Sequence, residues 1–271
     1  MKYAGLLAVA VGIALFGATF GCHYTLPGRA EEQNADPEIE KVSATGIAVV
    51  ELFTSEGCSS CPPADVLLAE LIKDAKDNKR PVFCLAFPVD YWNKLGWTEP
   101  YGDPNHTKRQ QEYSKALRTD QIYTPQMIVN GTDGFVGSDK VKAKKSIAAA
   151  LEQKATTAVT VGIEKSTGAN GVTITYEIAS VPKNSVLNVA VVESGLVSKV
   201  TRGENAGQTL GHDNVVRVFT TVAIERNGKG TVALKLPDGL IRKKSQVLCY
   251  VQHPDTKAIV GAAAINLDPG K

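Results

Sequence analysis

The stretch VELFTSEGCSSCPPAD, residues 50–65, carries two cysteines, Cys58 and Cys61, in a Cys-x-x-Cys arrangement. It joins an apolar run at residues 46–53 to leucines at helical spacing in residues 64–75, which predicts a strand, a turn and a helix. Two sulfurs at this spacing reach each other within one turn, and the unpaired N–H groups at a helix start favour a thiolate at Cys58. The stretch therefore predicts thiol–disulfide chemistry at a strand-to-helix turn.

The elements expected after this helix follow the order of the thioredoxin fold, with an insertion before its second half. A buried strand at residues 81–87 comes first, and a polar helix follows at 105–118. Then come a strand at 126–129, a hairpin turn at 130–131, a partner strand at 135–136 and a final helix at 138–154. In that fold a cis-proline lies opposite the two sulfurs, keeps metals from them and presents the preceding backbone to the substrate. Thr124 and Pro125 occupy this position, so we expect a cis peptide bond between them.

Glu51 is a charged residue in the otherwise apolar first strand, seven positions before Cys58. Thioredoxins keep a buried acid in this region, which accepts a proton from the second, resolving cysteine. Glu51 is the candidate for that role here. A carboxylate at the strand end that reaches solvent is the alternative, and both interpretations stay open.

A metal site is the main chemical alternative to redox chemistry. A Cys-x-x-Cys motif is half of a zinc site, and the further ligands that zinc requires have no matching spacing in this sequence. We therefore expect no metal and no cofactor, although a copper-handling dithiol needs fewer ligands and stays open. Cys84 and Cys249 lie in apolar runs, and we interpret them as buried strand cysteines.

Two further segments have less specific interpretations. Tyr91, Trp92 and Trp97 are aromatic residues in the insertion, and we expect them to pack in the core or at a domain interface. Residues 202–214 are unusually polar between two strands. A solvated connection is the favoured interpretation of this segment, and a recognition loop is the alternative.

The N-terminus has the pattern of an export signal. A basic start, Met1-Lys2, precedes the uncharged residues 3–21, and Cys22 then follows as the acylated cysteine of a bacterial lipoprotein would. We favour lipidation at Cys22 over an uncleaved membrane anchor or cleavage with release. All three place the remaining chain outside the cytoplasm, in the cell envelope or beyond. Residues 23–45 are acidic and aperiodic, which predicts a flexible tether.

After residue 156, strand-like segments alternate with turns and no useful helical period appears. Six or seven short strands at this spacing predict an all-β, sandwich-like domain. The expected fold is thus an α/β thioredoxin-like domain with an insertion, over residues 46–155, followed by a β-rich domain over residues 156–271. The chain has 271 residues, a net charge of +2 and 6% aromatic residues, which disfavours nucleic acid as a partner.

Several of these segments resemble an exported bacterial family known as domain of unknown function 1223. The resemblance spans about residues 46–265 and is most specific at residues 50–65. Other matching segments are VDYW at 89–92, LGW at 95–97, YTPQM at 123–127, FVGS at 135–138, RGENAGQTL at 202–210 and NVVR at 214–217. The resemblance implies a thioredoxin-like fold with a β-rich extension and an extracytoplasmic location, and it names no substrate. Pro88 stands where the family often has a histidine before the VDYW segment.

We expect an extracytoplasmic thiol–disulfide oxidoreductase that acts on protein thiols and disulfides. Cys58 would attack a partner's disulfide, Cys61 would resolve the mixed disulfide, and Thr124 with Pro125 would shape the substrate groove. The membrane would be a partner only through the lipid anchor. Two alternatives remain, namely an envelope binding protein whose Cys58–Cys61 disulfide is structural, and a copper-handling dithiol protein.

Overall fold

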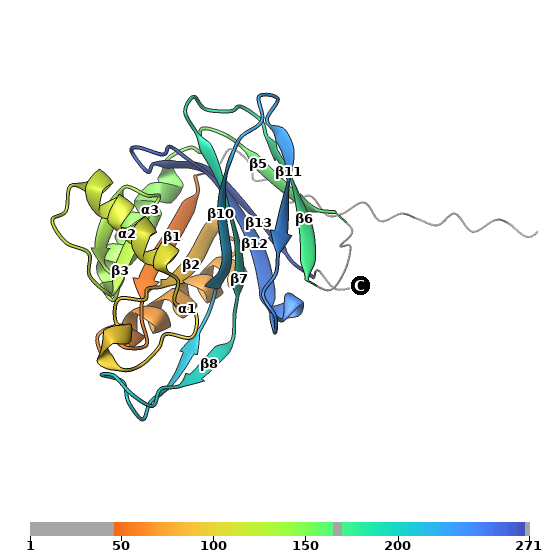
Figure 1. Cartoon of the computed structure of the whole chain (residues 1–271). Helices are drawn as coiled ribbons and strands as arrows, with labels where there is room; N and C mark the ends of the chain where they lie inside the picture. The colour runs from red at the N-terminus through yellow and green to blue at the C-terminus, as the bar shows by residue number, and fades with distance from the viewer. Residues whose placement is uncertain (1–45, 165–169, 269–271) are drawn as a thin grey trace, which may run out of the picture. The chain divides into compact units, whose positions relative to one another are not determined.

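Strands from both halves of the chain share one large sheet in the computed structural model, which describes residues 46–164 and 170–268 (Figure 1). The strand order in this eight-stranded sheet is β13-β12-β7-β10-β2-β1-β3-β4. Its strands are β1 (Ala48–Thr54), β2 (Val82–Pro88), β3 (Gln126–Val129), β4 (Asp133–Val136), β7 (Val186–Glu193), β10 (Val215–Ala223), β12 (Ser245–Gln252) and β13 (Ile259–Asn266). The described chain thus has a mixed α/β fold with a large central sheet and few helices.

Two smaller β-structures accompany the large sheet. A three-stranded sheet consists of β11 (Lys229–Lys235), β6 (Gly171–Ile178) and β5 (Val159–Ile163), and a hairpin consists of β8 (Leu196–Lys199) and β9 (Thr209–His212). The helices are α1 (Pro62–Asp77), α2 (Pro104–Leu117) and α3 (Lys140–Glu152), with short 3-10 turns η1 (Asn93–Leu95) and η2 (Arg242–Lys244). No helix in the described part of the chain is long and apolar enough to cross a membrane.

The first strand, turn and helix form as the sequence predicts. β1 pairs in parallel with β2 along its whole length, and α1 connects the two strands. Pro62 and Pro63 occupy the first turn of α1, where their missing N–H groups cost no helical hydrogen bond. The hairpin of β3 and β4 and the helix α3 also match their predicted positions, and the side chain of Asp139 caps α3 by accepting from Lys142 N at 2.9 Å.

Alternate residues of β1 point to opposite faces of the sheet and belong to two different cores. Ala48, Val50 and Leu52 pack with residues of α1 and α3. On the other face, Val49 and Phe53 pack with Tyr113 of α2 and with residues of β7 and β12. The second core therefore extends across both halves of the chain.

The two regions expected on either side of residue 155 are joined through the large sheet. β10 pairs with β2 in parallel at Val215 and Ala86, and Ala86 N donates to Asn214 O at 2.9 Å. β10 thereby covers the edge of β2 that would otherwise end the sheet. The described residues all belong to one compact unit.

The three-stranded sheet packs against one face of the large sheet. Side chains of β5, β6 and β11 form a common core with alternate residues of β7 and β12, among them Val189, Val191 and Cys249. Most strands of this region lie where the sequence predicts them, whereas the β8–β9 hairpin was not expected. The export signal, Cys22 and the tether lie outside the described residues.

Candidate functional site

The two cysteines of the motif lie side by side at the start of α1, and both are free thiols. Cys58 is 1% exposed and Cys61 is fully buried. A tight turn brings them together, with Cys61 N donating to Cys58 O at 3.2 Å. Cys61 already has helical backbone angles and is the N-cap of α1, so the pair stands at the positive end of the helix dipole.

The pKa values of the two thiols are shifted in opposite directions. A hydrogen bond from Cys61 lowers the pKa of Cys58 to about 6, in opposition to burial, and Ser60 and Thr124 contribute further hydrogen bonds. The Ser60 hydroxyl lies 3.3 Å from Cys58 Sγ. Burial, followed by the neighbouring Cys58 sulfur, raises the pKa of Cys61 well above its usual range. At neutral pH the pair therefore consists of a Cys58 thiolate and a Cys61 thiol.

The Thr124–Pro125 peptide bond is cis and faces the pair, as the sequence predicts. Cys58 Sγ lies 3.8 Å from the carbonyl oxygen of Thr124. Trp92 Nε1 donates to Thr124 Oγ1 at 2.8 Å, and Gln110 Nε2 donates to the carbonyl oxygen of Tyr123 at 2.7 Å. An aromatic residue of the insertion and a residue of α2 thus hold the cis-proline segment against the cysteines.

Residues 202–207 cover the cysteine turn, which corrects their interpretation as a solvated connection. Asn205 is buried, and its Nδ2 donates to the carbonyl oxygens of Glu56 and Cys58, both at 2.9 Å. Glu204 accepts hydrogen bonds from Ser59 N at 2.9 Å and Ser59 Oγ at 2.7 Å. The C-terminal region therefore forms part of the cysteine site.

The structure also corrects the role predicted for Glu51. Its side chain is buried on the α2 face of β1, whereas Leu52 points to the α1 face. Arg109 of α2 binds the Glu51 carboxylate through two hydrogen bonds of 2.8 and 2.7 Å. The hydroxyls of Tyr113 and Tyr250 donate to the same carboxylate at 3.0 and 2.8 Å. Glu51 is thus not exposed at a strand end, and its carboxylate is bound on the face of β1 opposite to α1.

A different group of acids lies beside the cysteines, and none of them had a predicted role; Glu56 and Glu99 are buried, and the side chain of Asp65 is 9% exposed. Glu56 is in the cysteine turn, Asp65 is in the first turn of α1, and Glu99 precedes α2. His212 of β9 pairs with two of them, since its Nε2 lies 2.9 Å from Glu56 Oε1 and its Nδ1 lies 3.9 Å from Asp65 Oδ2. We call Glu56, Asp65, Glu99 and His212 the acid–histidine cluster.

Neutral donors complete the surroundings of this cluster. Trp97 Nε1 donates to Glu56 Oε2 at 2.8 Å. Glu99 Oε2 accepts from Glu56 N at 2.6 Å and from Ser55 Oγ at 3.1 Å. The aromatic residues of the insertion therefore do more than pack, because Trp92 and Trp97 each donate a hydrogen bond to a residue that surrounds the cysteine pair.

Burial and the charges of neighbouring groups shift the pKa values of the acids in the acid–histidine cluster in different directions. Burial raises the pKa of Asp65 to about 7, and the charges of Cys58 and Glu56 add to this rise while His212 opposes it. Burial and the charge of Glu56 likewise raise the pKa of Glu99 to about 7. Burial opposes ionisation of Glu56, but hydrogen bonds from His212, Ser198 and Trp97 outweigh it and lower the pKa.

His212 is the cationic partner in this cluster. Burial alone would lower its pKa, but the close Glu56 carboxylate, 2.9 Å away, and the charge of Asp65 outweigh burial and raise it. A protonated histidine and an ionised Glu56 therefore form the paired core of the cluster. Asp65 and Glu99 are the members that titrate near neutral pH.

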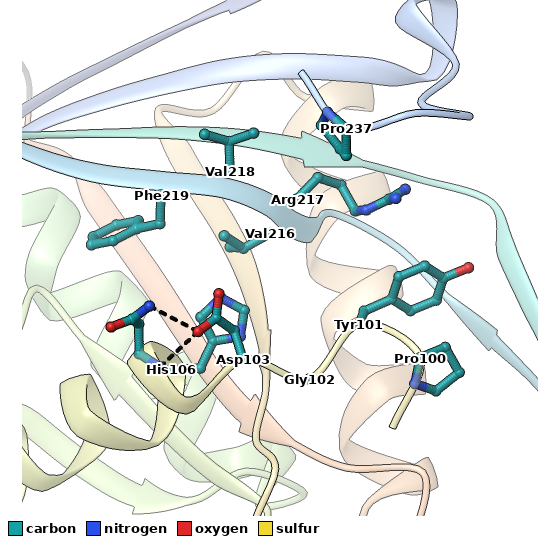
Figure 2. A pocket seen from close by; sticks show the side chains of 11 residues that line it. Pro100, Tyr101, Gly102, Asp103, His106, Val216, Arg217, Val218, Phe219 and Pro237 are labelled. Carbon is teal, nitrogen blue, oxygen red and sulfur yellow. Dashed lines mark hydrogen bonds between the residues drawn. The ribbon is translucent and has the colours of Figure 1, made fainter. Parts of the chain in front are cut away.

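The remaining expected and observed features lie away from the cysteine pair. Cys84 and Cys249 are buried strand cysteines as predicted, and burial raises the pKa of each to about 12. A pocket of about 230 Å³ lies between the start of α2 and β10 (Figure 2). Arg217 in its wall pairs with Glu193 and stacks over the Tyr101 ring at 4.9 Å. Its cation is thus already engaged within the chain.

These observations define the class of the protein as a mixed α/β protein with a buried, free cysteine pair at a strand-to-helix turn, facing a cis-proline. The chain belongs to the family described as protein of unknown function (DUF1223), whose profile matches residues 49–252. The resemblance seen in the sequence motifs is thereby confirmed. No curated protein matches the chain at a significant level.

Two solved structures share this fold over most of the chain. Protein AGR_C_4864 from Agrobacterium tumefaciens has 29% sequence identity and a TM-score of 0.62, with 85% of this chain and 98% of that chain covered. HBP35 of Porphyromonas gingivalis has 20% identity and a TM-score of 0.59, with 84% of this chain and 77% of that chain covered. Both are similar in architecture, and the second supports the fold alone.

Proposed function

We propose that this chain is a thiol–disulfide oxidoreductase that acts on protein substrates outside the cytoplasm. The observation that carries this proposal is the asymmetric pair, a low-pKa Cys58 beside a high-pKa Cys61, facing the Thr124 carbonyl across a cis-proline. A thiolate is the attacking species in disulfide exchange, and a nucleophile with a pKa near ambient pH reacts fastest. This arrangement favours redox chemistry over a structural role.

In the reductive direction the chemistry proceeds in two steps. The Cys58 thiolate attacks one sulfur of a partner's disulfide, a mixed disulfide forms, and the other partner sulfur leaves as a thiolate. Cys61 then loses its proton and attacks Cys58 Sγ, which releases the second partner sulfur. The Cys58–Cys61 dithiol is oxidised by two electrons, and the partner's disulfide is reduced to two thiols. The oxidative direction is the reverse of these steps.

The finer fold and location assignments belong to the same proposal. The order β1-α1-β2, followed by β3-β4-α3 with the cis-proline before β3, supports a thioredoxin-like arrangement. The packing of β5, β6 and β11 on β7 and β12 supports a sandwich-like C-terminal part. The export signal and Cys22 support a lipid-anchored protein in the cell envelope.

The reduction potential of the Cys58–Cys61 pair is the first test. The full chain is equilibrated with glutathione buffers, its thiols are trapped, and the labels on the two cysteines are mapped by mass spectrometry. A reversible couple between about −120 and −270 mV is expected, the range from strong oxidants to thioredoxin. A disulfide far below about −300 mV would instead indicate a structural bond and an envelope binding protein.

A variant pair tests the activity itself. Cys58→Ser should abolish reduction of a protein disulfide such as insulin's while the far-ultraviolet circular dichroism stays unchanged. Cys249→Ala is the matched control, because Cys249 is buried in the core of the two sheets and away from the pair, and it should retain activity. Full activity in Cys58→Ser would overturn the proposal. Tight Cu(I) binding by the reduced parent, without reductase activity, would favour the copper-handling alternative.

A further inference from the structure

The proposed exchange reaction needs a group that takes the proton of Cys61, and the described structure offers one that differs from Glu51. Cys61 is the cysteine that stays protonated at neutral pH, and it must ionise before it can attack the mixed disulfide. Glu51 is bound by Arg109 and two tyrosine hydroxyls on the other side of β1. Four hydrogen bonds, two of them from the Arg109 guanidinium, hold its carboxylate on that side.

We propose that Asp65, positioned by His212, accepts the proton of Cys61 when Cys61 attacks the mixed disulfide and returns it in the reverse reaction. This inference rests on the proposed thiol–disulfide function. It assigns a role in that function to a residue of α1 and makes a residue of the C-terminal region, His212, part of the same site.

Asp65 lies in the first turn of α1, close to the cysteine pair along the helix. Asp65 follows Cys61 by four residues, and its backbone N donates to Cys61 O at 3.2 Å, so the two are successive residues on one helix face. Side chains on a helix lean toward its N-terminus and cover the preceding turn. The Asp65 carboxyl therefore lies over the turn that carries the cysteine pair. Its side chain is only 9% exposed.

The partners of Asp65 differ in kind from those of Glu51. The groups that face it are His212 of β9, Cys58 and Glu56 of the cysteine turn, and the Thr54 hydroxyl at the end of β1. Glu99, which precedes α2, faces Glu56 and His212 in turn. His212 is thus the cation near Asp65, at 3.9 Å and shared with Glu56. A carboxyl with one shared, titratable counter-charge gains and loses a proton more easily than one bound by arginine.

The acidity of Asp65 fits this task. Its pKa of about 7 lies near ambient pH, where an acid–base group is most effective. The Cys58 charge contributes to this raised pKa. When Cys58 enters the mixed disulfide it loses that charge, so Asp65 becomes more acidic and is ionised at neutral pH. Asp65 is therefore prepared as a base at the stage when Cys61 must lose its proton.

The Cys61 S–H bond breaks and the proton moves to the Asp65 carboxylate. The Cys61 thiolate forms a bond to Cys58 Sγ, and the bond between Cys58 and the partner's sulfur breaks. The electron pair leaves with the partner's sulfur as a thiolate, which takes a proton from Asp65 or from water. The partner's disulfide is the oxidant, and the dithiol of the chain is the reductant.

The test uses 5,5′-dithiobis(2-nitrobenzoate), which releases one coloured thiolate in each of the two steps. The reduced full chain is mixed with the reagent in a stopped-flow instrument, and both phases are followed as a function of pH. In Asp65→Asn the first phase at pH 7 should stay within about twofold of the parent, because Cys58 is already ionised. The second phase should slow by about tenfold or more, since general base catalysis is lost.

Two further variants define the role of each residue. Asp77→Asn is the matched control, because Asp77 is an exposed aspartate at the far end of α1 that pairs with Lys73, and neither phase should change. His212→Gln removes the positive charge beside Asp65. The midpoint of the second phase should therefore move to higher pH, whereas a merely structural role would leave the midpoint unchanged and alter only stability.

Each outcome decides the inference. An unchanged second phase and an unchanged pH profile in Asp65→Asn would overturn it while the proposed function stands. A parent chain that releases no thiolate from the reagent would overturn the proposed function and this inference together. If Asp65→Asn does not fold, carboxyl carbon-13 titration of the reduced parent decides the matter. One aspartate should titrate near neutral pH and shift on oxidation of the pair, and no such aspartate would refute the inference.

Discussion

Two groups of buried acidic side chains lie near β1, and they differ in the cation that each contains. On the α2 face, Glu51 is bound by Arg109, whose guanidinium also stacks over the ring of Phe219 at 4.8 Å. At the end of β1, the acid–histidine cluster has His212 as its cation. Arginine stays charged at every accessible pH, whereas histidine titrates near neutrality.

The identity of the cation determines what each group can do. The Glu51–Arg109 pair joins β1, α2 and β12, since Tyr250 and Gln252 also bind Arg109 at 3.0 and 3.1 Å. Its hydrogen bonds connect the two halves of the chain. The acid–histidine cluster contains three acids and one histidine, so its protonation changes within the physiological range. Only this second group is suited to exchange protons with the cysteine pair.

The largest expected effect comes from breaking the arginine pair. Arg109→Met should lower the free energy of unfolding by about 3 to 5 kcal/mol, because it leaves the Glu51 carboxylate buried without a counter-charge. Urea denaturation at pH 7 measures this loss. The matched control is the double variant Glu51→Gln/Arg109→Met, which removes both charges and should regain more than half of it. Equal losses in both variants would show that packing, and not the charge pair, dominates on this face.

The second prediction concerns the pH dependence of the acid–histidine cluster. Burial raises the pKa of Glu99 from 4.5 to about 7, so the protonated form is favoured in the folded state. The stabilisation is fully present below about pH 4.5 and is lost as the pH rises through about 7. Glu99→Gln should remove this dependence. As the pH rises from 4.5 to 8, the free energy of unfolding of the variant should increase by on the order of 2 to 3 kcal/mol relative to that of the parent.

Urea denaturation at a series of pH values measures the effect of Glu99→Gln. Glutamine keeps a side-chain oxygen that can accept from Glu56 N and Ser55 Oγ, so the local hydrogen bonds survive. Glu225→Gln is the control, because Glu225 is an exposed glutamate of the same chain. A pH profile of Glu99→Gln that runs parallel to the parent's would show that Glu99 does not titrate with folding.

Much of the fold on the N-terminal side follows from local sequence signals. Apolar runs and leucine spacing located β1, α1 and β2, and the paired prolines located the start of α1. The continuity of the sheet did not follow, because β10 meets β2 through the pairing of Val215 with Ala86, which are far apart in sequence. The β8–β9 hairpin was missed because its two strands have only four residues each.

The site likewise contains residues that the sequence predicts and residues that it does not. Cys58, Cys61 and the cis-proline are readable because they lie in short motifs with fixed spacing. The alternation of β1 contains an unused signal about Glu51, because Glu51 and Leu52 are neighbours in a strand and must point to opposite faces of the sheet. Glu56 and Asp65 lie within the motif itself, but their partner His212 comes from β9. Sequence reasoning has no local rule that joins residues so distant.

The smallest expected effect concerns the segment that covers the cysteine turn, residues 202–207. The Glu51–Arg109 pair is held by charged hydrogen bonds. Asn205, by contrast, holds the covering segment on the cysteine turn through two neutral hydrogen bonds, to the carbonyl oxygens of Glu56 and Cys58. Asn205→Ala should lower the free energy of unfolding by only about 1 to 2 kcal/mol. A segment held this weakly can open locally without global unfolding.

The same variant should make Cys58 more reactive. We expect a substrate's disulfide to reach the buried Cys58 sulfur only when the covering segment moves. If the free energy of opening this segment falls by about 1 to 2 kcal/mol, alkylation by iodoacetamide should become about 5- to 30-fold faster. Gln208→Ala is the control, because Gln208 is an exposed residue that directly follows the covering segment. The thiolate absorbance at 240 nm, titrated in both variants, separates access from acidity. Faster alkylation with an unchanged titration would assign the effect to opening, and an unchanged rate would mean that Cys58 is reached by another path.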